Sequence, residues 1–172
     1  MRFSQAALSG LRLPVESIEL IFKWFKAGKG FLVFLGGVGI GKTYFCSALL
    51  NYNIKNPRFD TARYWDEKSL LARVRASMDQ GGDYLATLNY LCDNELLIID
   101  DVGASGMTEW RKEIFLSVVD TRYRLQHPAV FTSNLTPNDF LSLYGDRVCS
   151  RLFATENTII EAWTGDLRQS SL

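Results

Sequence analysis

The sequence contains little cysteine and almost no histidine. Three cysteines are spread over 172 residues without a CxxC pattern, and His127 is the single histidine. A zinc site of cysteine and histidine ligands needs more of both residue types at closer spacing, so we expect none. We interpret each cysteine as a small apolar core residue of a protein in a reducing compartment. The three are Cys46, Cys92 and Cys149.

The sequence also lacks an excess of charge and a long apolar segment. Lysine plus arginine and aspartate plus glutamate number 19 each, so no overall basic charge indicates nucleic-acid binding, and only a local basic face could serve it. The longest apolar run, GFLVFLGGVGIG, is too short to span a bilayer and is rich in glycine. The N-terminus has no apolar core of signal-peptide length. We therefore expect a cytoplasmic protein without membrane contact.

What the sequence does contain is a regular alternation of apolar runs with amphipathic segments. A chain of this length is expected to form about one domain. Strands are expected at residues 31–35, 62–65, 96–100, 129–134 and 157–163, and helices at 15–26, 44–54, 67–78, 83–92, 108–126 and 137–144. Three helices follow a residue that is typical of an N-cap, namely Asp66, Thr108 and Thr136. The order predicts an α/β fold in which helices flank a mostly parallel sheet.

The residues after the first expected strand carry the clearest chemical signal. The stretch GGVGIGKT, residues 36–43, fits the phosphate-binding pattern GxxxxGK[ST], in which backbone N–H groups surround a phosphate and the next helix adds its positive end. An ordinary glycine turn is the alternative, but the position between a buried strand and a helix favours nucleotide binding. Lys42 would reach the β- and γ-phosphates, and Thr43 would bind Mg²⁺. The predicted nucleotide contacts are Gly36, Gly37, Val38, Gly39, Ile40, Gly41, Lys42, Thr43 and Tyr44.

The stretch LLIIDDVG supplies two carboxylates at the end of another buried strand. Ligands of parallel sheets collect at the carboxyl ends of the strands, so these side chains could lie beside the phosphate loop. Asp100 would hold Mg²⁺ through water, and Asp101 could polarise the attacking water. A simple Asp-Asp turn is the alternative, which the phosphate loop upstream disfavours.

Two further polar residues have two interpretations each. Asn134 ends the expected strand VFTSN and could orient water against a γ-phosphate, or it could only begin the turn into LTPNDF. Arg122, within the stretch DTRYR, could line a subunit interface, or it could form an ion pair with Asp120 or a neighbouring carboxylate. The residues alone leave both pairs of alternatives open.

The stretch GDRVCSRLF, residues 145–153, places Arg147 and Arg151 on one face of a helix because they are four residues apart. This pattern is typical of a surface helix, although a helix that presents a cation to a nucleotide could look the same. Arg147 could instead pair with a carboxylate such as Asp146 or Glu156.

These motifs together resemble the ATPase domain of DnaC/IstB-type AAA+ proteins, which are bacterial and phage helicase loaders and transposase-assisting ATPases. The match covers roughly residues 30–168 and rests, in chain order, on GGVGIGKT, LLIIDDVG, DTRYR, VFTSNLT, GDRVCSRL and WTGDLR. The resemblance implies a P-loop fold of the AAA+/ASCE type with a five-stranded parallel sheet flanked by helices. In that sheet the strand at 129–134 would lie between those at 31–35 and 96–100.

The resemblance also implies roles for single residues. Lys42 and Thr43 would belong to Walker A, and Asp100 and Asp101 to Walker B. Asn134 would be sensor 1. Arg151 would be an arginine finger that acts on the nucleotide of a neighbouring subunit, with Arg147 as the fallback.

By the same resemblance, we expect an ATPase that uses ATP and Mg²⁺ and forms an ATP-dependent homo-oligomer. It would contact single-stranded DNA and load or remodel a replicative DNA helicase in a bacterium or a phage-infected host. The client could instead be a transposase, or the chain could bind ATP as a regulator or decoy of another AAA+ assembly. A compact P-loop kinase is a further alternative, although no arginine-rich lid or acceptor pocket is evident. Residues 1–30 would form a short N-terminal helical extension and residues 31–172 the ATPase domain, without a C-terminal helical lid.

Overall fold

The computed structural model describes residues 5–104 and 106–163 of the chain, and in these residues five strands alternate with helices. The strands are β1 (Phe31–Gly36), β2 (Ala62–Asp66), β3 (Leu96–Val102), β4 (Ala129–Ser133) and β5 (Thr158–Ala162). The helices are the short 3₁₀ helix η1 (Leu8–Gly10) and α1 (Val15–Ala27), α2 (Lys42–Lys55), α3 (Glu67–Asp79), α4 (Tyr84–Cys92), α5 (Glu109–Arg124), α6 (Pro137–Tyr144) and α7 (Asp146–Leu152).

The strands form one parallel sheet in the order β2-β3-β4-β1-β5. Strand β4 therefore lies between β1 and β3, which confirms the order that the family resemblance implies. Because all pairs are parallel, the carboxyl ends of the strands meet at one edge of the sheet. The carboxyl ends of β1, β3 and β4 and the segments that follow them are neighbours at that edge, and they carry all the predicted site residues except Arg151.

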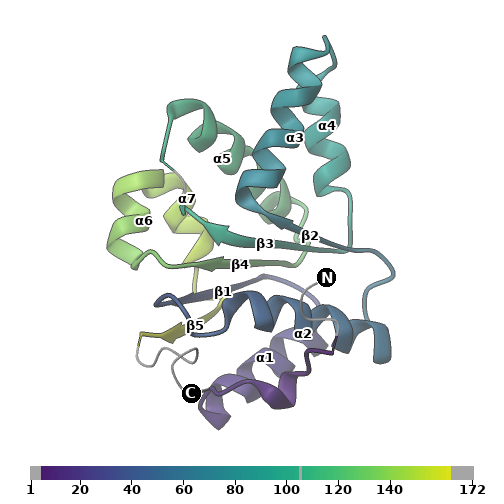
Figure 1. Ribbon diagram of the computed structural model, residues 1–172, viewed down its shortest axis with the longest axis vertical. Coiled ribbons are helices and arrows are strands. Elements are labelled where there is room, and N and C mark those ends of the chain that lie inside the picture. The colour runs from purple at the N-terminus through teal and green to yellow at the C-terminus, as the bar shows by residue number, and fades with distance from the viewer. Residues whose placement is uncertain (1–4, 105, 164–172) are drawn as a thin grey trace.

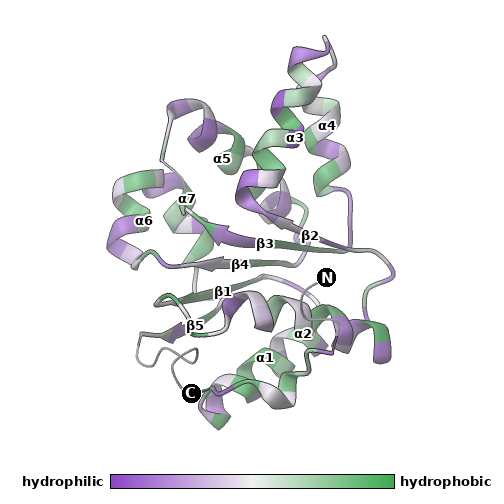
Figure 2. Cartoon of the chain, viewed as in Figure 1, coloured by the Kyte–Doolittle hydropathy of each residue, from purple (hydrophilic) through white to green (hydrophobic). Residues whose placement is uncertain are grey.

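Helices cover both faces of the sheet (Figure 1). Helices α3 to α7 pack on one face, and α1, α2 and η1 pack on the other. The central strands are apolar at every position except near their carboxyl ends, because both of their faces are buried. In Figure 2 hydrophobic and hydrophilic residues alternate along α3, as expected of a helix with one buried side.

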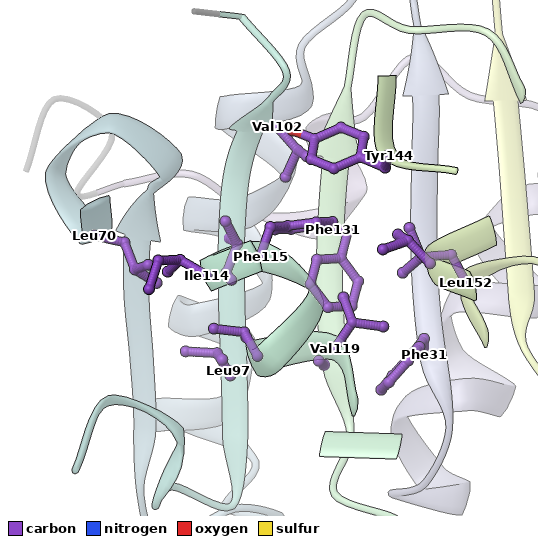
Figure 3. Packing of buried hydrophobic residues seen from close by; sticks show 14 of the residues in the cluster. Phe31, Leu70, Leu97, Val102, Ile114, Phe115, Val119, Phe131, Tyr144 and Leu152 are labelled. Carbon is purple, nitrogen blue, oxygen red and sulfur yellow. The ribbon is translucent and has the colours of Figure 1, made fainter. Parts of the chain in front are cut away.

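Aromatic side chains fill the core between the sheet and α5 (Figure 3). Phe131 of β4 lies between Phe31 of β1 and Phe115 of α5, with ring centroids 5.3 and 5.7 Å away. Both pairs meet edge to face, the favourable arrangement for aromatic rings. Among the cysteines, which are all free, Cys46 and Cys92 are buried and Cys149 is half-buried, so the core interpretation holds for the first two.

Side-chain caps fix three helix starts where the sequence predicts them. The side chain of Asp66 accepts a hydrogen bond from Ser69 N at 2.9 Å, and Thr108 accepts one from Arg111 N. Thr136 begins a capping box with Asp139, and Pro137 follows as the first helical residue. Helix α2 differs from the prediction, since it begins two residues earlier and includes Lys42 and Thr43 in its first turn.

The N-terminal segment packs against α2 and the sheet. Ile21, Trp24 and Phe25 of α1 are buried in the same cluster as residues of α2 and of β1. The division into residues 1–30 and 31–172 stays a prediction, and the expected absence of a lid concerns residues outside those described. Within the described residues, no helix is both long and apolar enough to cross a bilayer.

Candidate active site

The loop between β1 and α2 has a backbone that only glycine accommodates readily. Gly39 and Gly41 have φ angles of 87° and 96°, in the left-handed region that disfavours side chains. A Cβ atom on Gly36 would lie 2.2 Å from the carbonyl oxygen of Ala162, so no larger residue fits without a shift of β5. Ile40 is buried and anchors the loop to the sheet. The loop is therefore held in the conformation that a phosphate cradle requires.

Helix α2 starts on Gly41, which has no side chain with which to cap the helix. Helices α3, α5 and α6 begin instead on side chains that accept hydrogen bonds from their first turns. The first N–H groups of a helix have no partner within it, and its positive end favours an anion. The start of α2 thus suits a phosphate group, in agreement with the GGVGIGKT motif.

Lys42 lies inside this loop and links it to β4. Its side chain is buried, and Nζ donates hydrogen bonds of 2.7 Å to the carbonyl oxygens of Gly36 and Gly37. A further hydrogen bond of 2.6 Å runs from Nζ to Oδ1 of Asn134. The ammonium therefore lies at the mouth of the cradle, where it could exchange protein oxygens for phosphate oxygens.

Asn134 in turn contacts the predicted catalytic carboxylate. Its Nδ2 donates to Oδ1 of Asp101 over 3.3 Å, so Lys42, Asn134 and Asp101 form a continuous hydrogen-bonded chain. Asn134 therefore lies beside the phosphate loop, where its predicted role would require it, and this role stays a prediction. Burial, and next the charge of Asp100, raise the pKa of Asp101, while Lys42 acts in the opposite direction.

Asp100 is the more deeply buried carboxylate, with 3% of its surface exposed. The hydroxyls of Tyr64 (2.8 Å) and Thr132 donate to its two oxygens, and Cys46 Sγ of α2 lies 3.8 Å from Oδ1. Thr43 is three residues before Cys46 and shares its side of the helix, so the predicted Mg²⁺ ligands face the same region. Hard oxygen donors from a carboxylate and a hydroxyl suit Mg²⁺, which keeps several waters in such sites.

Sequence reasoning missed the residues that hold the two carboxylates. Thr132 is fully buried, and its hydroxyl both donates to Asp100 and accepts from the backbone N–H of Asp101 at 3.0 Å. The signal that could have revealed it is a threonine that directly follows the apolar residues AVF in the buried strand AVFTS. Tyr64 gave no such signal, because tyrosine is ordinary in a half-buried strand.

The structure does not bring Arg151 to the other predicted site residues. Its carbonyl oxygen accepts from Asn157, which also accepts from the N–H of Phe31, the first residue of β1. The phosphate loop follows the other end of this six-residue strand, roughly 17 Å away. Arg151 therefore lies at the opposite edge of the sheet from Lys42.

One carboxylate of α5 binds both arginines of α7. Asp120 lies 2.6 Å from Nε of Arg151 and 2.5 Å from Nη2 of Arg147. Arg147 therefore pairs with a carboxylate, as one interpretation has it, but the partner is Asp120 rather than Asp146 or Glu156, because α7 packs alongside α5. The helix is neither a simple surface helix nor part of its own chain's nucleotide site.

Arg122 has neither of its expected roles. It is fully buried and donates to the carbonyl oxygens that end α4 and precede β3 and β4, rather than to Asp120 or an interface. Burial lowers its pKa to about 10, so it stays charged at neutral pH. The carbonyl partners belong to Cys92, Asn94, Glu95 and Pro128.

Comparison with known proteins agrees with this geometry. The model of the family described as "IstB-like ATP binding protein" matches residues 19–153. The chain belongs to this family. It is therefore a DnaC/IstB-type AAA+ protein of an ATP-binding family, as the motifs indicate.

Relatives of this IstB-like protein include replication proteins. The replicative helicase loader DnaI of Bacillus subtilis is 30% identical over 113 residues, which cover 65% of this chain and 35% of DnaI. A crystal structure of the DnaC helicase loader has a TM-score of 0.78 at 24% identity and covers 92% of this chain and 98% of that one. The replication initiator DnaA, in a structure with AMPPCP and single-stranded DNA, has a TM-score of 0.78 at 20% identity and covers 91% and 49%. Such likeness of the solved structures shows the AAA+ P-loop fold. The chain spans between 35% and 59% of the length of the first curated relatives it matches.

Proposed function

We propose that this IstB-like protein hydrolyses ATP in an assembly of its own subunits and thereby loads or remodels a replicative DNA helicase. The observation that carries the ATPase part is the hydrogen-bonded chain of Lys42, Asn134 and Asp101 at the carboxyl edge of the sheet. The helicase as client rests on those curated relatives that are named replicative helicase loaders. Contact with single-stranded DNA and a bacterial or phage-infected cytoplasm belong to the same proposal.

Each residue of the site would have one task. The loop of residues 36–41 and Lys42 would bind the phosphates. Thr43 and Asp100 would hold Mg²⁺, which when bound neutralises charge on the phosphate oxygens. Asp101 would accept a hydrogen bond from the attacking water, and Asn134 would orient that water against the γ-phosphate.

Arg151 would act on the nucleotide of a neighbouring subunit. It lies at the opposite edge of the sheet from its own phosphate loop, so only another chain can bring it to a nucleotide. A guanidinium directed at the transferred phosphate stabilises charge that develops in the transition state. Asp120 would hold Arg151 in a fixed direction until the neighbour's phosphate is reached.

The decisive experiment measures the mass of the particle in solution with Mg²⁺ and a nonhydrolysable ATP analogue, with and without a replicative helicase. We expect the wild-type chain to assemble with the analogue and to bind the helicase, and Lys42→Ala to do neither. A chain that stays monomeric with the analogue and binds neither the helicase nor single-stranded DNA would contradict the proposal. Binding to a transposase in place of the helicase would identify a transposase as the client. Full activity of Lys42→Ala would favour a regulator that needs no hydrolysis.

A further inference from the structure

The backbone that carries Asp101 departs from regular strand geometry. Asp101 has a φ angle of 59°, and the pairing of β3 with β4 is irregular between Ile99 and Val102. Such a conformation is unfavourable for a residue with a side chain and persists only where neighbours hold it. Thr132 accepts from the N–H of Asp101 at 3.0 Å, and Ser133 donates to the carbonyl oxygen of Val102 at 2.6 Å.

Glu67 holds the next residue of this turn. Its Oε2 accepts a hydrogen bond of 3.0 Å from the backbone N–H of Gly103, which itself has a φ angle of 79°. Its Oε1 accepts a hydrogen bond of 2.7 Å from the hydroxyl of Tyr144, the last residue of α6. Glu67 therefore joins the start of α3, the turn after β3 and the end of α6.

The burial of this carboxylate calls for an explanation. Only 4% of Glu67 is exposed, and burial raises its pKa while its two hydrogen bonds lower it. An acidic residue in the first turn of a helix is favourable on the surface too, so the start of α3 does not require burial. Burial of Glu67 is explained by its two partners, the half-buried backbone amide of Gly103 and the buried hydroxyl of Tyr144, because buried polar groups need a hydrogen-bond partner.

We propose that Glu67 is a positioning residue that keeps Asp101 in place for hydrolysis by fixing Gly103. This inference rests on the proposed ATPase function. Through Tyr144 the same carboxylate reaches the junction at Gly145, from which α7 and its arginines begin. Val102 and Tyr144 also pack in one buried cluster, so turn and junction are in the same core (Figure 3).

The first test measures hydrogen exchange of the Gly103 amide, which needs no nucleotide. Glu67→Ala removes the acceptor, and we expect exchange at Gly103 to be about tenfold faster, while β1 and β4 exchange as in the wild type. Glu67→Gln keeps an oxygen for Gly103 and should restore slow exchange. Glu67→Asp, which is shorter by one methylene but keeps the charge, tests the same hydrogen bond if Glu67→Ala fails to fold.

The second test measures ATP hydrolysis of the same variants. We expect Glu67→Ala and Glu67→Asp to lower kcat about 10- to 100-fold, with KM for ATP within about twofold, because the carboxylate of Asp101 is displaced and the phosphate loop is not. Glu67→Gln should recover most of kcat. The matched control is Glu95→Ala, since Glu95 also accepts a backbone N–H, from Asp60 at 2.7 Å, but at the far end of β3.

Two results would overturn the inference about Glu67 and leave the proposed ATPase function standing. One is unchanged exchange at Gly103 in Glu67→Ala and Glu67→Asp. The other is an unchanged kcat in these variants while the wild type hydrolyses ATP. A wild-type chain that binds ATP without hydrolysing it would instead remove the proposed function, and the positioning role of Glu67 with it.

Discussion

A hydrogen bond of 2.6 Å joins Nζ of Lys42 to Oδ1 of Asn134, between residues that are 92 positions apart in the chain. The same ammonium donates to the carbonyl oxygens of Gly36 and Gly37. An ammonium has three donors, so phosphate oxygens would have to compete with these three acceptors. Nucleotide binding is therefore expected to loosen the contact between the phosphate loop and β4.

Removing this ammonium should weaken ATP binding. Hydrogen bonds from a charged donor contribute about 2–3 kcal/mol, so we expect Lys42→Ala to bind ATP roughly 30- to 150-fold more weakly. Equilibrium titration with a fluorescent ATP analogue measures this. The control is Lys55→Ala, an exposed lysine in the last turn of the same helix, which should bind as the wild type does. Equal affinity of the two variants would remove Lys42 from the site.

Neutralising Asp101 should separate binding from hydrolysis. In Asp101→Asn the amide can still accept a hydrogen bond from Asn134 but is too weak a base to polarise water, so we expect ATP affinity within about twofold of the wild type and kcat lower by about 10²- to 10⁴-fold. Radiolabelled phosphate release measures kcat. An Asp101→Asn variant that hydrolyses ATP at the wild-type rate would assign the base to another residue.

The pH dependence of hydrolysis follows from the position of Asp101. Burial and the neighbouring charge of Asp100 raise its pKa above the ordinary value of 3.8. The ionised form is the active one, so the rate should fall as pH drops through this raised pKa, and its acid midpoint should lie above 3.8. A kcat profile between pH 4 and 8, taken where the fold is intact, checks this. A rate that stays constant down to pH 4 would mean that Asp101 does not control the rate.

The sequence predicts the sheet and the phosphate loop well because local patterns determine both. Strands buried on both faces are short apolar runs, and helix caps such as Asp66 and Thr136 act on residues two or three positions away. The loop's glycines and Lys42 are likewise close together in the chain. The strand order came instead from the family resemblance, since no local pattern decides whether β4 pairs with β1.

The partners of the charged residues could not be predicted because they come from distant segments. Asp120 binds both arginines of α7 only because α7 packs on α5, and the sequence shows neither fact. In the sequence, Glu67 has the pattern of an acidic residue in the first turn of a surface helix, so its burial and its contacts with Gly103 and Tyr144 could not be predicted. Arg122 is the clearest case, since an arginine in a helix of mixed character is expected at a surface.

Arg122 is expected to be essential for stability. Its guanidinium donates to four carbonyl oxygens that end α4 and flank the starts of β3 and β4. Arg122→Ala leaves these oxygens without their donor, which should lower the free energy of unfolding by about 3 kcal/mol. Arg122→Lys should recover little of it, because a single ammonium cannot reproduce the planar fork. Urea unfolding followed by circular dichroism measures this, and exposed Arg124→Ala should behave as the wild type.

The arginine finger can be tested by mixing two inactive variants. Arg151→Ala should bind ATP normally and hydrolyse it roughly 10³-fold more slowly in the assembly, and Asp101→Asn should likewise bind ATP and assemble but hydrolyse it poorly. If Arg151 acts on a neighbouring subunit, mixed assemblies contain sites with an intact Asp101 on one chain and an intact Arg151 on the next. In an equal random mixture roughly a quarter of such head-to-tail interfaces are complete, so hydrolysis should recover to about that fraction. Arg147→Ala is the matched comparison, because Arg147 lies on the same helix and binds the same Asp120. The Arg147 side chain is 65% exposed, against 25% for that of Arg151. Recovery with Arg147→Ala in place of Arg151→Ala would identify Arg147 as the arginine finger. No recovery with either variant would mean that the arginines of α7 contact only their own chain.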